Sequence, residues 1–306
     1  MRIGLFMFPS RDPKVMVERI VQVEREGFEA VWLAQVMGPD SLALLALAGQ
    51  ATQKIGLGTA VVPVYLRHPI FMAQQAATVN AAVGGRLSLG IGPSHRVTVE
   101  DMWGFSYARA AHYMREYLVV LRTLLEKGSV QFQGDFFKVN VTLQLPQVPM
   151  PPIIVSALGP IMLKMAGELA DGTVTWMTGP KALEGHVLPR IREAARRAGR
   201  PEPCVVVGLP VAVTANKERA RARAAQIFQF YGQLPSYRRM LDLEGVQGPQ
   251  EIAVVGMEEE VEAALRHLAS LGVTDFIASV FPEGDGSDEE SMNRTRTFLA
   301  SLVGKI

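Results

Sequence analysis

Two glycine-proline pairs near the middle of the chain have the chemistry of anion-binding turns. They lie in the segments Ser156-Ala157-Leu158-Gly159-Pro160 and Trp176-Met177-Thr178-Gly179-Pro180, each between an apolar run and a helical pattern. Proline suits the first turn of a helix, where the free N–H groups attract a phosphate. An ordinary strand-to-helix turn is the alternative for each pair. Two such turns after successive strands favour a shared phosphate site.

A histidine after another apolar run is the candidate acid or base. The segment Leu89–His95 reads Leu-Gly-Ile-Gly-Pro-Ser-His, so small residues lead to Ser94 and His95. The third glycine of a dinucleotide-binding motif is missing, which makes that interpretation weak. Small residues at a strand end instead make room for a flat ligand, and an adjacent imidazole exchanges a proton near neutral pH. A loop histidine that caps a turn is the alternative.

The other candidate reactive residues fit structural roles. His68 precedes a proline at a helix start, which indicates a cap, and Cys204 lies in an apolar run as a buried packing residue. A single cysteine excludes a disulfide framework and a cysteine-based metal site. Three histidines fall on helical patterns and are expected at the surface or between helices: His112, His186 and His267. Metal-ligand spacing and a Gly-x-Ser-x-Gly elbow are both missing, so metalloenzyme and hydrolase functions lose support.

The composition narrows the class of protein that must position these residues. The chain has 306 residues, of which 48% are hydrophobic and 20% charged, so it can bury a sizeable core. A formal net charge of +1 argues against nucleic-acid binding. The first apolar stretch is too short for a signal peptide, and an uninterrupted membrane-spanning run is missing. We therefore expect a cytoplasmic protein that acts on a small molecule, without a nucleic-acid or membrane partner.

Strand-like and helix-like segments alternate along the whole chain. Eight predicted strands are each followed by a helical pattern: Ile3–Phe8, Phe28–Leu33, Ile55–Pro63, Arg86–Gly92, Pro152–Ser156, Gly172–Met177, Cys204–Val213 and Asp275–Phe281. Residues 130–150 break this rhythm with alternating apolar residues, which predict a small β-hairpin insertion. The pattern favours an α/β fold of the (β/α)8 TIM-barrel type, in one domain over residues 1–306. A doubly wound open sheet is the alternative.

Five short segments, in order, resemble the luciferase-like oxidoreductases: Gly27–Leu33 (GFEAVWL), Ile55–Thr59 (IGLGT), Arg67–Pro69 (RHP), Gly84–Gly92 (GGRLSLGIG) and Leu169–Gly172 (LADG). The chain is most similar to the branch that uses the deazaflavin coenzyme F420, which includes methylenetetrahydromethanopterin reductase. The resemblance extends from Ile3 to about Phe281 and implies a (β/α)8 barrel. Such barrels often dimerise, so we expect a homodimer.

The resemblance also implies a cofactor site. In relatives, a non-prolyl cis peptide on the third strand supports the flavin-like ring, and the matching bond here joins Ala60 and Val61. The turn at Leu158 and Gly159 matches the one that meets the cofactor phosphate. The complete set of implied cofactor-binding residues is Ala60, Val61, Ser94, His95, Ala157, Leu158, Gly159, Trp176, Thr178 and Gly179.

One departure from the family bears on the reaction. Relatives that oxidise alcohols or sugar phosphates carry an Asp-His pair after the second strand, where this chain has Ala34 and Gln35. An amide hydrogen-bonds but takes no proton at neutral pH. We therefore expect hydride transfer between F420 and a small organic substrate, an imine or enone rather than an alcohol, with His95 and Gln35 as the catalytic candidates. The alternatives are an FMN-dependent monooxygenase and a non-catalytic flavin-binding or F420-binding protein.

Overall fold

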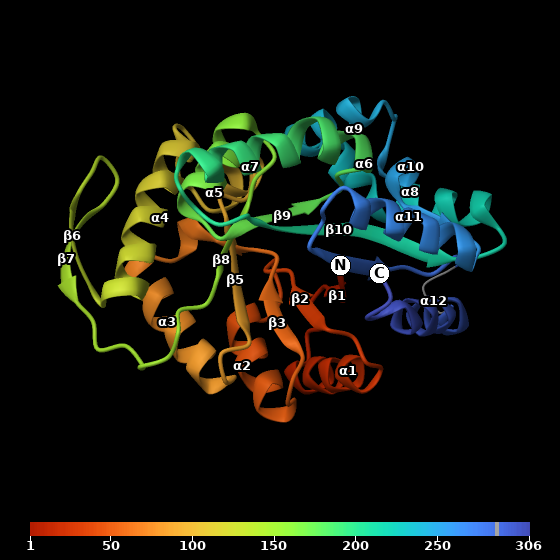
Figure 1. The fold of residues 1–306 in the computed structure, drawn as a ribbon, viewed down its shortest axis with the longest axis horizontal. Coiled ribbons are helices and arrows are strands. Elements are labelled where there is room, and N and C mark those ends of the chain that lie inside the picture. Colours follow the sequence, from red (N-terminus) through yellow and green to blue (C-terminus); the bar gives the residue numbers. More distant parts are fainter. Residues whose placement is uncertain (285–287) are drawn as a thin grey trace.

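The computed structural model of the protein describes residues 1–284 and 288–306. Its centre is a closed barrel of eight parallel strands (Figure 1): β1 (Arg2–Met7), β2 (Ala30–Leu33), β3 (Gly56–Thr59), β5 (Leu87–Gly92), β8 (Ile153–Ser156), β9 (Gly172–Trp176), β10 (Cys204–Val213) and β12 (Asp275–Val280). Strand β1 pairs with β12, and β9 pairs with β10, so the ring closes. The predicted TIM barrel is confirmed, and every barrel strand except the third lies close to its predicted bounds.

Helices surround the barrel on the outside (Figure 1). The longer ones are α1 (Pro13–Arg25), α2 (Ser41–Ala51), α3 (Pro69–Ala82), α4 (Ala110–Lys127), α5 (Pro160–Leu169), α7 (Leu188–Arg197), α8 (Lys217–Gln233), α9 (Pro235–Glu244), α11 (Glu258–Ser270) and α12 (Glu289–Leu302); α6 (Pro180–Ala182) and α10 (Pro249–Ile252) are short. His68 caps α3, as predicted, because its Nδ1 accepts a hydrogen bond from Ile70 N. Within the described chain, every helix is too short or too polar to cross a bilayer.

The third barrel strand is broken, although its sequence predicts a continuous strand over Ile55–Pro63. Strand β3 stops at Thr59, and the chain returns to the sheet as β4 (Val62–Pro63), which pairs with β5. The Thr59 hydroxyl bridges the interruption, because it donates to Gly90 O at 2.7 Å and accepts from Gly90 N at 2.8 Å. A Cβ at Gly90 would collide with the Thr59 carbonyl oxygen, so only glycine permits this approach. The intervening residues form a bulge.

The predicted insertion is an antiparallel hairpin of β6 (Ser129–Gln133) and β7 (Lys138–Thr142), beside α4. The carboxylate of Glu116 on α4 holds the turn by accepting the backbone N–H groups of Asp135, Phe136 and Phe137 at 2.8, 2.9 and 3.1 Å. A short parallel strand, β11 (Val254–Gly256), pairs with β10 outside the ring and was not predicted. Both additions lie outside the closed barrel.

Candidate active site

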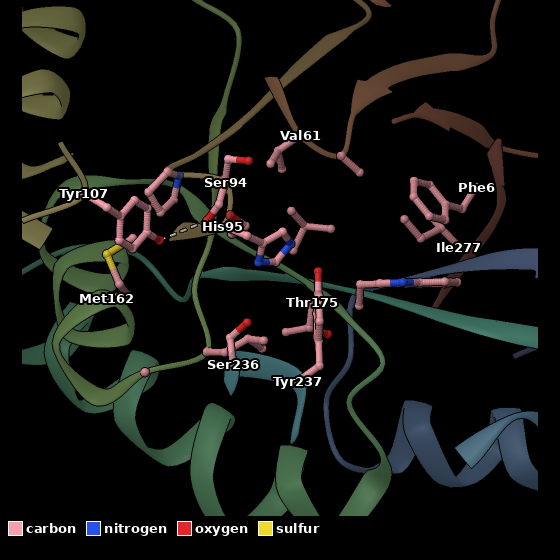
Figure 2. A pocket seen from close by; sticks show the side chains of 17 residues that line it. Phe6, Val61, Ser94, His95, Tyr107, Met162, Thr175, Ser236, Tyr237 and Ile277 are labelled. Atoms are coloured by element: carbon pink, nitrogen blue, oxygen red, sulfur yellow. Dashed lines mark hydrogen bonds between the residues drawn. The ribbon is translucent and has the colours of Figure 1, made fainter. Parts of the chain in front are cut away.

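A cavity opens at the carboxyl ends of the barrel strands and encloses about 850 Å³, counting its open mouth. In Figure 2, Val61 lies on one side of the cavity and Tyr237 and Ser236 on the other. Seven of the predicted site residues line it: Ala60, Val61, Ser94, His95, Leu158, Gly159 and Trp176. Four do not: Gln35, Ala157, Thr178 and Gly179.

The bulge in the third strand forms one wall of the cavity. Ala60 and Val61 line it, and the peptide bond between them is cis, as the family resemblance implies. Gly92, at the end of β5, makes room for the Ser156 side chain, because a Cβ at Gly92 would collide with Ser156 Oγ and lie 2.9 Å from Val61 Cγ2. Ser156 itself lines the cavity. The bulge thus gives the cavity a wall on which a flat ring can lie.

His95 follows the fourth barrel strand and reaches the middle of the cavity (Figure 2). The preceding Ser94 has a left-handed backbone with φ 60°, and the Tyr107 hydroxyl donates to its carbonyl oxygen at 2.9 Å. Burial lowers the pKa of His95, so the imidazole is neutral at pH 7. Among the described residues, none hydrogen-bonds to its ring nitrogens, which leaves them free for a ligand. The side chain therefore does not cap its own turn.

The first Gly-Pro turn, at the start of α5, is open. No side chain of the described chain caps this helix, and the space around the Cα of Gly159 is empty. The N–H groups of its first turn are therefore available to an anion. His186 holds the turn, because its Nε2 lies 2.7 Å from Leu158 O. A carbonyl only accepts, so Nε2 carries the proton; burial lowers the pKa of His186 and keeps the ring neutral.

The second Gly-Pro turn, at the start of α6, already carries an anion from the chain itself. Glu244, at the end of α9, is only 7% exposed, and its carboxylate accepts from Lys181 N at 3.3 Å and Ala182 N at 2.9 Å. A Cβ at Gly179 would lie 2.5 Å from the Glu244 Cδ atom, so the glycine makes room for this carboxylate. The Thr178 hydroxyl is buried and donates to Trp176 O. Cofactor contacts by Thr178 and Gly179 stay a prediction, and this arrangement counts against them.

Gln35 also has a local structural contact. Its Oε1 accepts from Ser41 N at 2.7 Å, and the Ser41 hydroxyl donates to Ala34 O at 2.8 Å. These bonds join the end of β2 to the start of α2. The amide oxygen is thus engaged outside the cavity, and a catalytic role for Gln35 remains an untested prediction.

Sequence reasoning missed two functional candidates, His186 and Glu244. Each contacts its turn from far along the chain, at separations of 28 and 62 residues. The helical pattern around His186 indicated only a position at the surface or between helices. Spacing in the sequence therefore carries no signal for either contact.

One group outside the cavity has the residue types of a metal site. His112, Glu116 and Asp135 gather beside the hairpin, with His112 Nε2 2.9 Å from Glu116 Oε1. Arg109 pairs with Asp135 at 2.5 Å, and three backbone N–H groups already bond to Glu116. These contacts account for the group as a support for the hairpin. Cys204 is also structural, because burial and the charge of Asp275 raise the pKa of its thiol to about 12.

Comparisons with known proteins agree with this architecture. The family model of the luciferase-like monooxygenases matches residues 1–275. The 5,10-methylenetetrahydromethanopterin reductase of Methanopyrus kandleri is 33% identical over 215 residues, which cover 64% of this chain and 61% of that protein. The solved coenzyme F420-dependent tetrahydromethanopterin reductase of the same organism superimposes with a TM-score of 0.82 at 24% identity, over 99% of this chain and 98% of that one.

A flavin enzyme shares the fold at a greater sequence distance. The oxygenating constituent of 3,6-diketocamphane monooxygenase from Pseudomonas putida, solved with FMN, has a TM-score of 0.79 at 17% identity, over 100% of this chain and 98% of that one. At such identities, the structural likeness supports the fold alone. The family model, by contrast, spans most of the sequence and confirms the resemblance of the motifs. The chain belongs to the luciferase-like monooxygenase family.

Proposed function

We propose that the protein is a coenzyme F420-dependent oxidoreductase that transfers a hydride between C5 of the deazaflavin and a small unsaturated substrate, such as an imine or an enone. The observation that carries this proposal is one cavity that contains both the bulge at Ala60 and Val61 and the uncapped start of α5 at Gly159. The bulge offers a surface for a flat ring, and the helix start offers N–H groups for a phosphate. Sequence similarity to a 5,10-methylenetetrahydromethanopterin reductase, an enzyme of the F420 branch, supports F420 over FMN.

The lining of the cavity fits such a cofactor. Trp176 lines the cavity, but its Nε1 is covered by protein and lies near the Tyr231 hydroxyl, so the indole offers apolar surface to a ring. Gly159 lines the same space at a helix start without a side-chain cap, where N–H groups suit a phosphate. We therefore assign Val61, Trp176 and Gly159 to cofactor binding.

The residues of the chain divide the work of the reaction. When bound, reduced F420 supplies a hydride, so it is oxidised as the double bond of the substrate is reduced. Val61 supports the ring from one side, the N–H groups at the start of α5 hold the phosphate, and His186 fixes the turn through Leu158 O. His95 would donate a hydrogen bond to the heteroatom of the substrate. As the proton that completes the reduction passes along this bond, the other ring nitrogen would take a proton from solvent, so the imidazole ends neutral.

The ionisable residues of the site favour reduction of a substrate over oxidation of an alcohol. Oxidation of an alcohol needs a base that removes the hydroxyl proton, and a carboxylate-imidazole pair is the usual device. Here Gln35 stands in place of the family pair, and its amide oxygen bonds to Ser41 N. The neutral His95 has no carboxylate against it in the described structure to raise its basicity. This set of residues suits a reductase better than an alcohol dehydrogenase.

Parallel titrations with F420 and with FMN, followed by fluorescence, test the cofactor. We expect micromolar affinity for F420 and negligible affinity for FMN. Oxidation of reduced F420 by a panel of imines and enones, followed by absorbance, then tests the reaction. Preference for FMN would move the protein to the monooxygenases, while tight F420 binding without turnover of any acceptor would indicate a non-catalytic binding protein.

We further propose that the protein works as a homodimer in the cytoplasm. The adjacent helices α2 and α3 each expose a large apolar side chain, Leu47 at 55% and Phe71 at 68%. A single cysteine suits a reducing compartment. Light scattering after size-exclusion chromatography tests the assembly, and the Phe71→Lys variant should shift the protein toward the monomer.

A further inference from the structure

The lining of the cavity carries no fixed charge. Among the described residues that line it, there is no Asp, Glu, Lys or Arg. The ionisable side chains there are His95, Tyr107 and Tyr237. Burial lowers the pKa of His95 and raises the pKa of each tyrosine, so all three are uncharged at pH 7. A ligand in this space meets only apolar surface and neutral hydrogen-bonding groups.

Aromatic rings form a connected cluster beside the cavity. We call this cluster the aromatic wall, and its rings follow one another in the order Phe8, Phe6, Trp176, Tyr231, Tyr237 and His95. Successive ring centres are 5.1, 4.9, 5.7, 5.5 and 5.4 Å apart. Four of the rings line the cavity itself: Phe6, Trp176, Tyr237 and His95. Tyr231 packs between Trp176 and Tyr237, and Phe8, which is 40% exposed just beyond the end of β1, packs on Phe6. Figure 2 shows Tyr237 across the cavity from Val61, opposite the bulge.

This combination selects ligands by charge and shape. A carboxylate or phosphate that enters an uncharged cavity loses its hydration without gaining a cation, which is unfavourable. A flat apolar molecule instead stacks on aromatic rings and exchanges water for their faces. The hydroxyl groups of Ser236 and Thr175 line the same space and provide neutral hydrogen bonds. The cofactor phosphate is not subject to this exclusion, because the start of α5 receives it.

We propose that the substrate of this protein is an uncharged, flat and largely apolar compound that lies along the aromatic wall, with its unsaturated bond beside His95. This inference rests on the proposed function and adds a substrate class to it. Phosphorylated sugars and carboxylate-bearing acids are excluded from the wall. The acceptor carries its polar atom at one end, where the neutral His95 donates to it.

Two probes of nearly equal shape test the substrate class: the para-nitro derivative of benzylideneacetone, a neutral aromatic enone, and the para-carboxylate derivative, which is an anion. Calorimetry with the protein saturated with oxidised F420 gives both dissociation constants. We expect the neutral probe to bind at least about 100-fold more tightly, because burial of an uncompensated charge is costly. Equal binding, or tighter binding of the carboxylate, would overturn the proposal, as would failure of both probes to bind.

A charge placed beside the aromatic wall sharpens the test. Phe8→Lys replaces the exposed ring that packs on Phe6 with a cation and should narrow the ratio between the probes about threefold to fivefold. Phe136→Lys, in the turn of the β6–β7 hairpin, is the matched control and should leave the ratio unchanged. If Phe8→Lys leaves the ratio where it is, the probes do not lie along the wall.

The proposed function and the proposed substrate class are tested by different measurements. F420 affinity is measured first on the same samples, and its loss counts against the proposed function alone. The ratio between the probes is also measured on protein without cofactor but with inorganic phosphate present to occupy the start of α5, so that this turn does not attract the carboxylate probe and the ratio still judges the charge preference of the aromatic wall.

Discussion

The two helix starts that share a Gly-Pro pair in this protein are opposite in structure. Both follow a barrel strand, and both present the first N–H groups of a helix toward the same end of the barrel. At Gly159 no side chain of the described chain caps the helix, and the turn lines the cavity. At Gly179 the buried carboxylate of Glu244 bonds to the N–H groups and takes the place of an external anion.

The difference shows that a helix start is a phosphate site only while it remains free. The glycine has a different use in each turn. Gly159 leaves open space for a ligand, whereas Gly179 leaves just enough room for the Glu244 side chain. The start of α6 is linked to the start of α5. Glu244 joins α9 to the start of α6, and the helical segment that follows carries His186, which holds the turn at Leu158. We therefore expect the phosphate of F420 at α5 alone.

The largest effect is expected from a variant that places a carboxylate at the uncapped start of α5. The Gly159→Asp variant adds a carboxylate cap where no atom obstructs it, so the fold should be retained. Because like charges in contact cost several kcal/mol, F420 affinity should fall about 100-fold or more in a fluorescence titration. Gly159→Ser, which caps without charge, should lose far less. Unchanged affinity in the aspartate variant would show that the phosphate lies elsewhere.

The next largest effect on F420 affinity should come from removing the hydrogen bond by which His186 holds the turn before α5. His186→Phe leaves Leu158 O without its donor and frees the turn. We expect F420 affinity to fall about tenfold, since a buried unsatisfied acceptor costs about 1–3 kcal/mol. His186→Gln retains a donor and serves as the matched control, with most of the affinity preserved. Equal affinities in the two variants would mean that the hydrogen bond does not position the turn.

Removing the Glu244 carboxylate from the start of α6 should lower the stability of the protein and leave cofactor binding nearly unchanged. Glu244→Ala leaves the N–H groups of Lys181 and Ala182 without an acceptor, so the free energy of unfolding in urea should fall by about 1–3 kcal/mol. F420 affinity should stay within about threefold, because the phosphate lies at the other turn. Glu244→Gln, which retains one acceptor oxygen, should be intermediate in stability. A loss of F420 affinity as large as that of Gly159→Asp would contradict the contrast.

Lowering the pH should reduce the stability of the folded protein slightly, because three of its histidines are neutral. Burial lowers the pKa values of His68, His95 and His186 in the folded protein. The unfolded chain then binds more protons below pH ~6.5, so stability is complete above this value and declines as the pH falls toward the folded pKa values. Urea unfolding at pH 7 and pH 5.5 measures this loss. His186→Gln should reduce it, and a steeper loss in that variant would refute the assignment.

The barrel was predictable because its signals are local. Alternating strands and helices, the hairpin and the cap at His68 each depend on neighbouring residues. The break in the third strand was not visible in its apolar run over residues 55–63, and only the family resemblance pointed to Ala60 and Val61. The contacts of His186 and Glu244 depend on how the helices pack after β8 and β9. Local chemistry thus indicated one phosphate site shared by the two turns, whereas tertiary packing leaves only the turn at Gly159 open.

The crystal structure of the F420 complex tests the central claim most directly. We predict the cofactor phosphate within hydrogen-bonding distance of the first N–H groups of α5, with the ring against Ala60 and Val61 and with Glu244 still bonded to Ala182 N. A phosphate at the start of α6, with Glu244 displaced, would contradict the account.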